Sequence, residues 1–427
     1  MSQNHDADVI VAGAGPAGAT AALTLARSGL RVLIIERYTL PRQKPCGGGI
    51  STRVLSRFPW LPDALTRIPT HPVSSLYLEG PSGDAFRMET RGPTVLMIRR
   101  IEFDHLLASL AVEAGATLLS PAAIAQAQQD ADGVTLRLRD GRELRAPMVI
   151  AADGVNSVIA RRLGMNPGWP AAKLALDMME ETPVQALRSA EPDTMAVFYG
   201  YGGAHGYAYI FPKREHVNVG IGYVLPYFKA RSGVTPYDLQ QRFVGDLCTR
   251  GLMEGASQRR HFTPFLIPIG GPLRHTGLGR VLLAGDAGGF VNGFSAEGIY
   301  YAMVTGELAA TAILSSRVSA AVSPARARRA YARSWKGEIG AELRDSVLIQ
   351  KYLFHSPERM DRVVRAARTR PVFSESLVDY ASGRLSYRAA RRRLICHFPR
   401  LLPRLAWLAL HARPAVHAAE TADPAEV

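Results

Sequence analysis

Apolar runs and helical spacing divide the start of the chain into short, regular segments. Residues 9–12 form an apolar run, residues 16–28 carry apolar positions at helical spacing behind a proline, and residues 31–35 form a second apolar run. Gly29 follows the helical segment, at a position where glycine commonly ends a helix. The pattern predicts a strand, a helix and a second strand, arranged as a parallel βαβ unit.

Later segments continue this alternation. Amphipathic helical spacing covers residues 100–114, and alternating residues around Asp140-Gly141 predict a hairpin ahead of a buried strand at 148–151. Another buried strand, predicted at 281–284, leads directly into a second glycine-rich segment. The pattern therefore indicates the α/β fold class.

Three glycines between the first predicted strand and the helix have the spacing Gly-x-Gly-x-x-Gly. A glycine-rich turn that opens a helix presents backbone N–H groups and the positive end of the helix dipole to a pyrophosphate. Glu36 closes the second strand, where a carboxylate accepts the hydroxyls of an adenosine ribose and disfavours a 2′-phosphate. The segment predicts a site for FAD or NAD rather than NADP, formed by Gly13, Gly15, Ala17, Gly18, Glu36 and Arg37.

Three further residues favour FAD over NAD. Asp286 lies at the carboxyl end of its predicted strand, from where a carboxylate can reach a ribityl hydroxyl. Arg100 opens its helix and either faces a phosphate or forms a surface ion pair. Asp153 follows another buried strand and meets either the cofactor or a helix terminus.

Composition bounds the class of protein. With 427 residues, 47% of them hydrophobic, the chain is long enough for two or more folding units. It opens on polar residues and has no apolar run of membrane-spanning length, so we expect a cytoplasmic location. Cys46, Cys248 and Cys396 lie far apart and make no metal-ligand spacing, so they are expected to be reduced and no metal site is predicted.

Positive charge gathers near the C-terminus. The formal net charge is +14, and residues 314–427 hold 21 Lys and Arg against 10 Asp and Glu. Two interpretations stay open for this region: a helical cap that packs on the main body, or peripheral contact with an anionic membrane at its inner face. No nucleic-acid-binding motif accompanies the charge, so no nucleic acid partner is expected. The region mixes arginines with large apolar residues, namely Arg384, Arg388, Arg391, Arg392, Arg393, Phe398, Leu401, Leu402, Leu405, Trp407, Leu408 and Leu410.

The order of these segments resembles the geranylgeranyl reductase family, within the FAD-dependent oxidoreductases typified by aromatic hydroxylases. Residues 44–51, Lys-Pro-Cys-Gly-Gly-Gly-Ile-Ser, are similar to the cysteine-glycine loop that these reductases place against the isoalloxazine. Residues 207–213, Tyr-Ala-Tyr-Ile-Phe-Pro-Lys, are similar to the family strand Tyr-x-Trp-x-Phe-Pro-Lys, with Tyr209 at the tryptophan position and 217–223 as the returning strand. Residues 292–298 depart from the family pattern, since they carry Asn-Gly and Ala-Glu-Gly where Asn-Pro and Gly-Glu-Gly are usual.

The resemblance implies an FAD-binding Rossmann-like domain with an inserted β-rich substrate domain and a helical C-terminal region. The expected boundaries are 1–70, 99–165 and 275–335 for the FAD domain, 71–98 and 166–274 for the substrate domain, and 336–427 for the basic C-terminal region. It also implies a helix beginning at Gly298, whose dipole faces the reduced flavin. The FAD contacts carried over are Gly18, Glu36, Cys46, Gly47, Gly49, Arg100, Ala122, Asp286, Gly298 and Ile299.

The activity implied by the resemblance is hydride transfer from reduced FAD to carbon–carbon double bonds of a geranylgeranyl or other prenyl chain. No carbonyl polarises such an alkene, so the site must hold it in a near-attack geometry and supply a proton to the other carbon. Cys46 and Tyr207 are the candidate catalytic donors, and either is otherwise a packing residue. The expected substrate contacts are Tyr207, Tyr209, Phe211 and Pro212.

Several questions stay open at this point. The head group on the prenyl chain is a diphosphate, a lipid, a chlorophyll precursor or a quinone, and the number of double bonds reduced is not fixed. Only one complete dinucleotide fingerprint is present, so the electron donor is NADPH docking transiently or a small acidic carrier such as reduced ferredoxin. Two alternative functions share the fold: an FAD-dependent aromatic or lipid monooxygenase, and a flavin electron carrier at a membrane surface.

Overall fold

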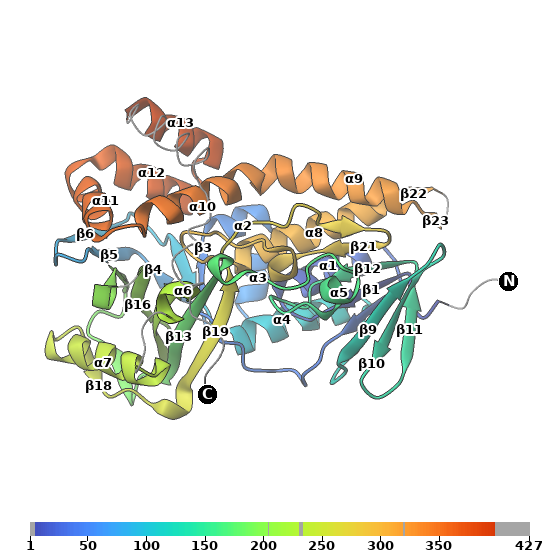
Figure 1. Ribbon diagram of the computed structural model, residues 1–427, viewed down its shortest axis with the longest axis horizontal. Helices are drawn as coiled ribbons and strands as arrows, with labels where there is room; N and C mark the ends of the chain where they lie inside the picture. Colours follow the sequence, from blue (N-terminus) through green and yellow to red (C-terminus); the bar gives the residue numbers. More distant parts are fainter. Residues whose placement is uncertain (1–4, 204, 230–233, 319–320, 398–427) are drawn as a thin grey trace, which may run out of the picture.

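Figure 1 shows the fold in a computed structural model that describes residues 5–203, 205–229, 234–318 and 321–397. Two large sheets lie on the left and right of centre in the view, and helices pack on both of them. The predicted α/β fold class, with an FAD-binding fold and helices toward the C-terminus, is confirmed.

The first large sheet has six strands in the order β20-β21-β12-β1-β2-β8. All neighbouring strands are parallel except β20, which is antiparallel to β21. Parallel strands bring their carboxyl ends to one edge, where open α/β sheets bind ligands. The strands are β1 (Val9–Ala12), β2 (Val32–Ile35), β8 (Thr117–Leu119), β12 (Met148–Ala151), β20 (Gly277–Leu278) and β21 (Val281–Leu283).

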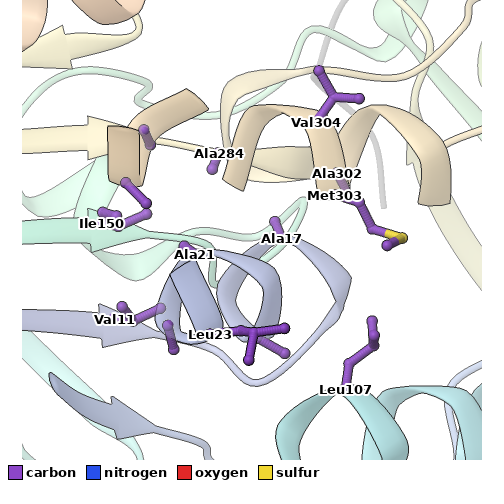
Figure 2. Close-up of a cluster of buried hydrophobic side chains, with 14 of the residues drawn as sticks. Val11, Ala17, Ala21, Leu23, Leu107, Ile150, Ala284, Ala302, Met303 and Val304 are labelled. Atoms are coloured by element: carbon purple, nitrogen blue, oxygen red, sulfur yellow. The ribbon is translucent and has the colours of Figure 1, made fainter. Parts of the chain in front are cut away.

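Three helices cover one face of this sheet: α1 (Pro16–Arg27), α4 (Arg100–Glu113) and α8 (Ile299–Ser315). Helix α1 packs against both α4 and α8. The approach of α8 is close, because a Cβ on Gly306 would lie 2.1 Å from the carbonyl oxygen of Ala17. Figure 2 shows the apolar side chains that this packing buries, among them Val11, Ala17, Ala21, Leu23, Leu107, Ile150, Ala284, Ala302, Met303 and Val304.

The other face of the six-stranded sheet packs against a small antiparallel sheet. This sheet has the order β11-β10-β9 and shares a buried core with Ile10, Ala12 and Val149 of the larger sheet. The hairpin predicted around Asp140-Gly141 is confirmed as β10 followed by β11. The elements on this face are β9 (Ile124–Gln129), β10 (Val134–Leu138), β11 (Glu143–Ala146) and α5 (Val158–Arg162).

The second large sheet has seven strands in the order β19-β13-β17-β16-β15-β5-β6. The predicted strand at 207–213 and its return at 217–223 are confirmed as the antiparallel pair β16 and β17. Helix α7 (Pro236–Thr249) covers one face of this sheet with an apolar core. The strands are β5 (Ser75–Glu79), β6 (Ala85–Glu89), β13 (Leu174–Pro183), β15 (Thr194–Tyr199), β16 (Gly206–Pro212), β17 (His216–Val224) and β19 (Phe262–Pro268).

Short elements complete the described part of the chain. A three-stranded sheet in the order β3-β7-β4 carries the cysteine-glycine loop at its first strand. Its strands are β3 (Gly49–Ser51), β4 (His71–Val73) and β7 (Val95–Met97). The remaining short pieces are α2 (Arg53–Arg57), α3 (Leu61–Leu65), α6 (Leu225–Lys229), β14 (Leu187–Ser189), β18 (Met253–Gly255), β22 (Arg317–Val318) and β23 (Ala321–Val322).

Helices form the C-terminal region as far as it is described. Helix α11 packs against β5 and β6 of the seven-stranded sheet, at the upper left of Figure 1. Several of the arginines that gave this region its charge form ion pairs: Arg391 with Asp345 at 2.8 Å and Arg393 with Glu375 at 3.0 Å. The helices are α9 (Pro324–Trp335), α10 (Ala341–Leu353), α11 (Pro357–Thr369), α12 (Pro371–Ala381) and α13 (Tyr387–His397).

The apolar residues that motivated the membrane interpretation, Phe398 to Leu410, lie outside the described residues. Within the residues that the structure describes, none of the helices has both the length and the apolar character needed to cross a membrane.

Candidate functional site

Close backbone contacts shape the glycine turn between β1 and α1. Gly13 has a φ of 98°, and a Cβ on it would lie 2.4 Å from the carbonyl oxygen of Ala152. A Cβ on Gly18 would lie 1.9 Å from the carbonyl oxygen of Gly13. Neither position has room for a side chain, so these two glycines hold the turn against the start of the helix.

Gly15 has room for a side chain instead. It is the N-cap of α1, and no side chain caps the helix there. The nearest atoms to a Cβ on Gly15 would be the Nη2 atoms of Arg42 and Arg100, each 3.9 Å away. The N–H groups of a first helical turn have no partner within the helix, and together with two nearby guanidinium groups they fit a diphosphate. The residues present therefore fit the central part of an FAD molecule.

Glu36 lies at the carboxyl end of β2 and is only 3% exposed. Its Oε2 accepts the N–H of Ala14 at 2.9 Å, and its Oε1 accepts the N–H of Tyr38 at 3.2 Å. Arg42 lies beside it, with Nε 3.3 Å from Oε1. The N–H of Ala122 donates to the backbone oxygen of Glu36 at 2.7 Å, which places Ala122 next to the predicted ribose contact.

A buried cluster of charges lies behind the glycine turn. Arg100 donates to Asp104 from Nε at 2.6 Å and from Nη2 at 2.8 Å, and Arg42 donates to the same carboxylate at 2.9 Å. Arg100 is buried, so the alternative that it forms a surface ion pair is wrong. The sequence analysis missed Arg42 and Asp104, because nothing in their spacing marks them.

Three other predicted contacts lie in this half of the site. Ala17 is buried in the first turn of α1, and Arg37 is exposed just after β2. Asp153 Oδ2 accepts the N–H groups of Val158 at 2.8 Å and Ile159 at 3.2 Å, so this carboxylate caps the start of α5. That is the helix-terminus role foreseen for Asp153, and its contact with a cofactor stays a prediction.

The second glycine-rich segment brings Asp286 and the start of α8 together. Asp286 lies in a short 3₁₀ turn directly after β21. A Cβ on Gly298 would lie 3.6 Å from Asp286 Oδ1. Gly298 is the N-cap of α8, Ile299 is its first residue, and no side chain caps this end. The free N–H groups of α8 therefore lie beside a carboxylate, at the same sheet edge as Gly15.

The cysteine-glycine loop lies against an aromatic strip on the seven-stranded sheet. A Cβ on Gly47 would lie 2.7 Å from Cδ2 of Phe211 and 3.8 Å from Cε2 of Tyr209. These two rings stack with their centroids 4.3 Å apart. Cys46 Sγ accepts a backbone N–H of the loop at 3.4 Å, and Gly49 opens β3. The loop and strand β16 thus form a single apolar wall.

Tyr207 and Pro212 have different surroundings from this pair of rings. The Tyr207 hydroxyl donates to the carbonyl oxygen of Ser295 at 2.7 Å and so connects β16 to the loop at residues 292–298. Side chains alternate along a strand, so Pro212 lies on the other sheet face with Ile210. It borders a cavity of about 190 Å³ there. Pro212 is therefore not grouped with the aromatic residues as expected, and its contact with substrate stays a prediction.

Buried Asp177 and partly buried Lys44 complete the wall, and neither was predicted from the sequence as a site residue. The Tyr209 hydroxyl donates to both carboxylate oxygens of Asp177 at 3.2 Å. Burial raises the pKa of Asp177 to about 7, against the lowering influences of Tyr209 and Lys44. Burial and the nearby Arg100 lower the pKa of Lys44 to about 8. An acid within the apolar strand run at 174–179 was the one available signal for Asp177.

The room for a methyl group at Gly15 allows a test of the proposed diphosphate contact. We expect Gly15→Ala to leave the stability of the FAD-free protein within about 0.5 kcal/mol of wild type. FAD affinity should nevertheless fall about tenfold or more, because the methyl group occupies the space meant for the diphosphate. Flavin fluorescence titration and thermal melting measure the two effects. Gly92→Ala is the matched control, because Gly92 also has room for a Cβ, which would meet nothing within 4 Å. Equal FAD affinity in both variants would contradict the assignment.

Comparisons with known proteins agree with this geometry. A family model described as an FAD binding domain matches residues 6–305. The chain is 32% identical to digeranylgeranylglycerophospholipid reductase 2 of Methanothermobacter thermautotrophicus, over 87% of this chain and 94% of the relative. It is 31% identical to the menaquinone reductase of Mycobacterium tuberculosis, over 78% of this chain and 83% of the relative.

A solved structure supports the fold. The geranylgeranyl bacteriochlorophyll reductase-like protein of Thermoplasma acidophilum superposes with a TM-score of 0.77 at 22% identity, covering 94% of this chain and 99% of that protein. Together with the glycine turn, Glu36 and the cysteine-glycine loop, these matches settle the family. The chain is an FAD-dependent oxidoreductase and belongs to the geranylgeranyl reductase family.

Proposed function

We propose that this chain uses FAD to reduce carbon–carbon double bonds of a geranylgeranyl or other prenyl chain. The observation that carries the proposal is the contact of the cysteine-glycine loop with the stacked rings of Phe211 and Tyr209. A buried aromatic surface against the loop expected to face flavin suits an alkene without polar groups.

The chain's own groups hold FAD along its whole length in this proposal. The N–H groups at the start of α1, with Arg42 and Arg100, receive the diphosphate, and Glu36 receives the adenosine ribose. Asp286 receives a ribityl hydroxyl. FAD, once reduced, supplies the hydride. The positive end of α8 at Gly298 stabilises negative charge on the reduced ring.

The substrate class follows from the same wall. Tyr207, Tyr209 and Phe211 exclude water and hold the prenyl chain, so the alkene is positioned rather than polarised. The proposed substrates are a prenylated lipid or a prenyl diphosphate, with a quinone or a chlorophyll precursor as further head groups. The names of the relatives include both a digeranylgeranyl lipid and a quinone, so the proposal specifies the chain and leaves the head group to experiment.

Cys46 provides a local test of this proposal. We expect Cys46→Ala to retain FAD, since the thiol contacts a loop N–H and the Arg100 guanidinium rather than the glycine turn. Alkene reduction should slow by about 10-fold to 10²-fold, because the loop that positions the ring loses a packing group. Single-turnover kinetics with bound flavin quantified measure both effects. Cys248→Ala is the matched control on α7, and an unaltered rate in Cys46→Ala would remove this thiol from the reaction.

The donor and the location are part of the proposal. NADPH or reduced ferredoxin reduces the flavin, and the basic C-terminal region lets the cytoplasmic chain contact the inner membrane face or an acidic carrier protein. Stopped-flow measurement of flavin reduction by NADPH and by reduced ferredoxin distinguishes the two donors. Cosedimentation with anionic and with neutral vesicles tests the membrane contact. Equal binding to both kinds of vesicle would contradict it.

The experiment for the proposed function is anaerobic. The FAD-loaded protein is reduced with dithionite and mixed with geranylgeranyl diphosphate, with a geranylgeranylated lipid, or with the fully saturated phytanyl analogue of each. We expect the unsaturated chains alone to reoxidise the flavin. Flavin that stays reduced with every chain and yields a hydroxylated product on aeration would favour the monooxygenase, and reoxidation by quinone alone would favour the electron carrier.

A further inference from the structure

Tyr209 reaches across a neighbouring strand to meet a buried acid. In the register of the sheet, Tyr209 of β16 lies opposite Gly220 of β17, and β13 with Asp177 follows on the far side of β17. A Cβ on Gly220 would lie 2.4 Å from the Tyr209 hydroxyl oxygen. Gly220 therefore leaves the space that the Tyr209 ring needs to extend across β17. In this position the Tyr209 hydroxyl reaches Asp177.

The hydroxyl and the carboxyl form a buried pair within the wall, and Tyr207 and Cys46 are the neighbouring titratable groups that act on Tyr209. Both Asp177 oxygens lie 3.2 Å from the Tyr209 oxygen, and the two side chains are 7% and 3% exposed. Among the described residues, Lys44 is the charged side chain that acts on Asp177, and its Nζ lies 3.0 Å from the centroid of the Phe265 ring. A buried carboxyl without a bonded cation favours its protonated form.

The Tyr209 ring borders the loop beside which the reaction is proposed. The other edge of the Tyr209 ring faces the cysteine-glycine loop, since its Cε2 would lie 3.8 Å from a Cβ on Gly47. Tyr207 differs in its acceptor: its hydroxyl donates to the Ser295 carbonyl, which has no proton to return, whereas the acceptor of Tyr209 is a carboxyl. Tyr209 thus combines proximity to the loop with a carboxyl behind it that can return a proton.

We infer that Tyr209 is the catalytic residue that protonates the alkene, and that Asp177 is the positioning residue that acts through it by returning the proton. This inference rests on the proposed function. As the alkene π bond breaks, one carbon takes the hydride that reduced FAD supplies and the other takes the hydroxyl proton of Tyr209. The proton of Asp177 passes to the Tyr209 oxygen, and solvent then reprotonates Asp177. Two-electron oxidation of reduced FAD to FAD balances the two-electron reduction of the alkene.

The inference explains a departure from the family. The strand motif usually carries tryptophan where this chain has Tyr209, and an indole has no hydroxyl to share with a carboxyl. In this chain the tyrosine, Gly220 and Asp177 occur together. Burial raises the pKa of the Tyr209 hydroxyl well above its ordinary value, so tyrosine alone is a weak acid and needs the protonated Asp177 behind it.

Conservative variants test the relay. In anaerobic single turnovers we expect Tyr209→Phe and Asp177→Asn to slow alkene reduction by about 10²-fold or more, the usual contribution of a general acid. FAD affinity should stay at the wild-type value in both. Tyr77→Phe is the matched control, because Tyr77 also donates to a carboxylate on this sheet, to Glu79 at 2.6 Å, away from the wall. Its rate should not change.

The pH dependence of turnover provides a second readout, which Asp177 would not alter if its role were packing alone. Wild-type turnover should fall as pH rises through about 7, because Asp177 must be protonated, and Asp177→Asn should lose this fall. Infrared difference spectra of the FAD-free protein should show a protonated carboxyl that titrates in the same range and is absent from Asp177→Asn. A carboxyl already ionised at pH 5 would contradict the inference.

The outcomes separate the two proposals. A wild-type enzyme that leaves every prenyl chain intact contradicts the proposed function, and the relay with it. A wild-type enzyme that reduces the chain while Tyr209→Phe keeps the full rate contradicts the relay alone. The same holds if Tyr207→Phe, rather than Tyr209→Phe, shows the large loss.

Discussion

Replacing Glu36 with arginine should remove FAD from the purified protein. The native carboxylate is buried and accepts two backbone N–H groups, from Ala14 and Tyr38, while Arg42 lies 3.3 Å away. With a guanidinium at this position, the site has no acceptor for the ribose hydroxyls, and the new positive charge repels Arg42. We expect FAD affinity to fall by about 3 kcal/mol or more, which is about 10²-fold.

Flavin-to-protein ratio after purification and fluorescence titration with added FAD measure this loss. Glu113→Arg is the matched control, since Glu113 also pairs with an arginine, Arg67 at 2.7 Å, but is exposed on α4. Circular dichroism must show folded protein in both variants. Normal flavin content in folded Glu36→Arg protein would overturn the place given to the adenosine ribose.

Arg53→Ala should be among the most destabilising single substitutions in this chain. Arg53 is 8% exposed and lies at the start of α2. It donates to Glu297 at 3.2 Å, to Glu342 at 3.0 Å and to the hydroxyl of Tyr301 at 3.0 Å, and it also contacts Tyr380. One guanidinium thereby joins the loop before α8 to the helices α10 and α12.

Removal of Arg53 leaves two largely buried carboxylates without their cation. Breaking a buried ion pair from one side costs about 3–5 kcal/mol. The midpoint of denaturant unfolding of the FAD-free protein measures this effect. Arg188→Ala is the control, because Arg188 and Glu254 form a pair in which both side chains are 61% exposed, which predicts a loss of less than about 1 kcal/mol. Equal midpoints for the two variants would contradict the role of Arg53.

Local patterns predicted the dinucleotide half of the molecule well. The strand, turn, helix and second strand at the N-terminus depend on residues adjacent in sequence, and Gly18 is required by a contact with Gly13 in that same unit. Gly13 is also required by a contact from outside the unit, with the carbonyl oxygen of Ala152. The helix predicted at 100–114 and the start of a helix at Gly298 are likewise local features. Hydrophobic periodicity and glycine spacing report such short-range requirements directly.

The chemistry of the wall could not be predicted in the same way. Lys44, Asp177 and Tyr209 come from three distant stretches of the chain and meet only because the seven-stranded sheet packs against the cysteine-glycine loop. The sequence did reveal tyrosine in place of the family tryptophan. The structural consequence of this tyrosine depends on the register of β16, β17 and β13. That register places Gly220 beside the Tyr209 ring and Asp177 beyond it.

The measurement that tests the central claim most directly is the mass of the prenyl chain recovered after one anaerobic turnover of the reduced, FAD-loaded protein. The account predicts that the chain gains the mass of two hydrogen atoms for each double bond reduced, in step with flavin reoxidation. An unchanged chain beside flavin that stays reduced, with a hydroxylated product once oxygen enters, would contradict it.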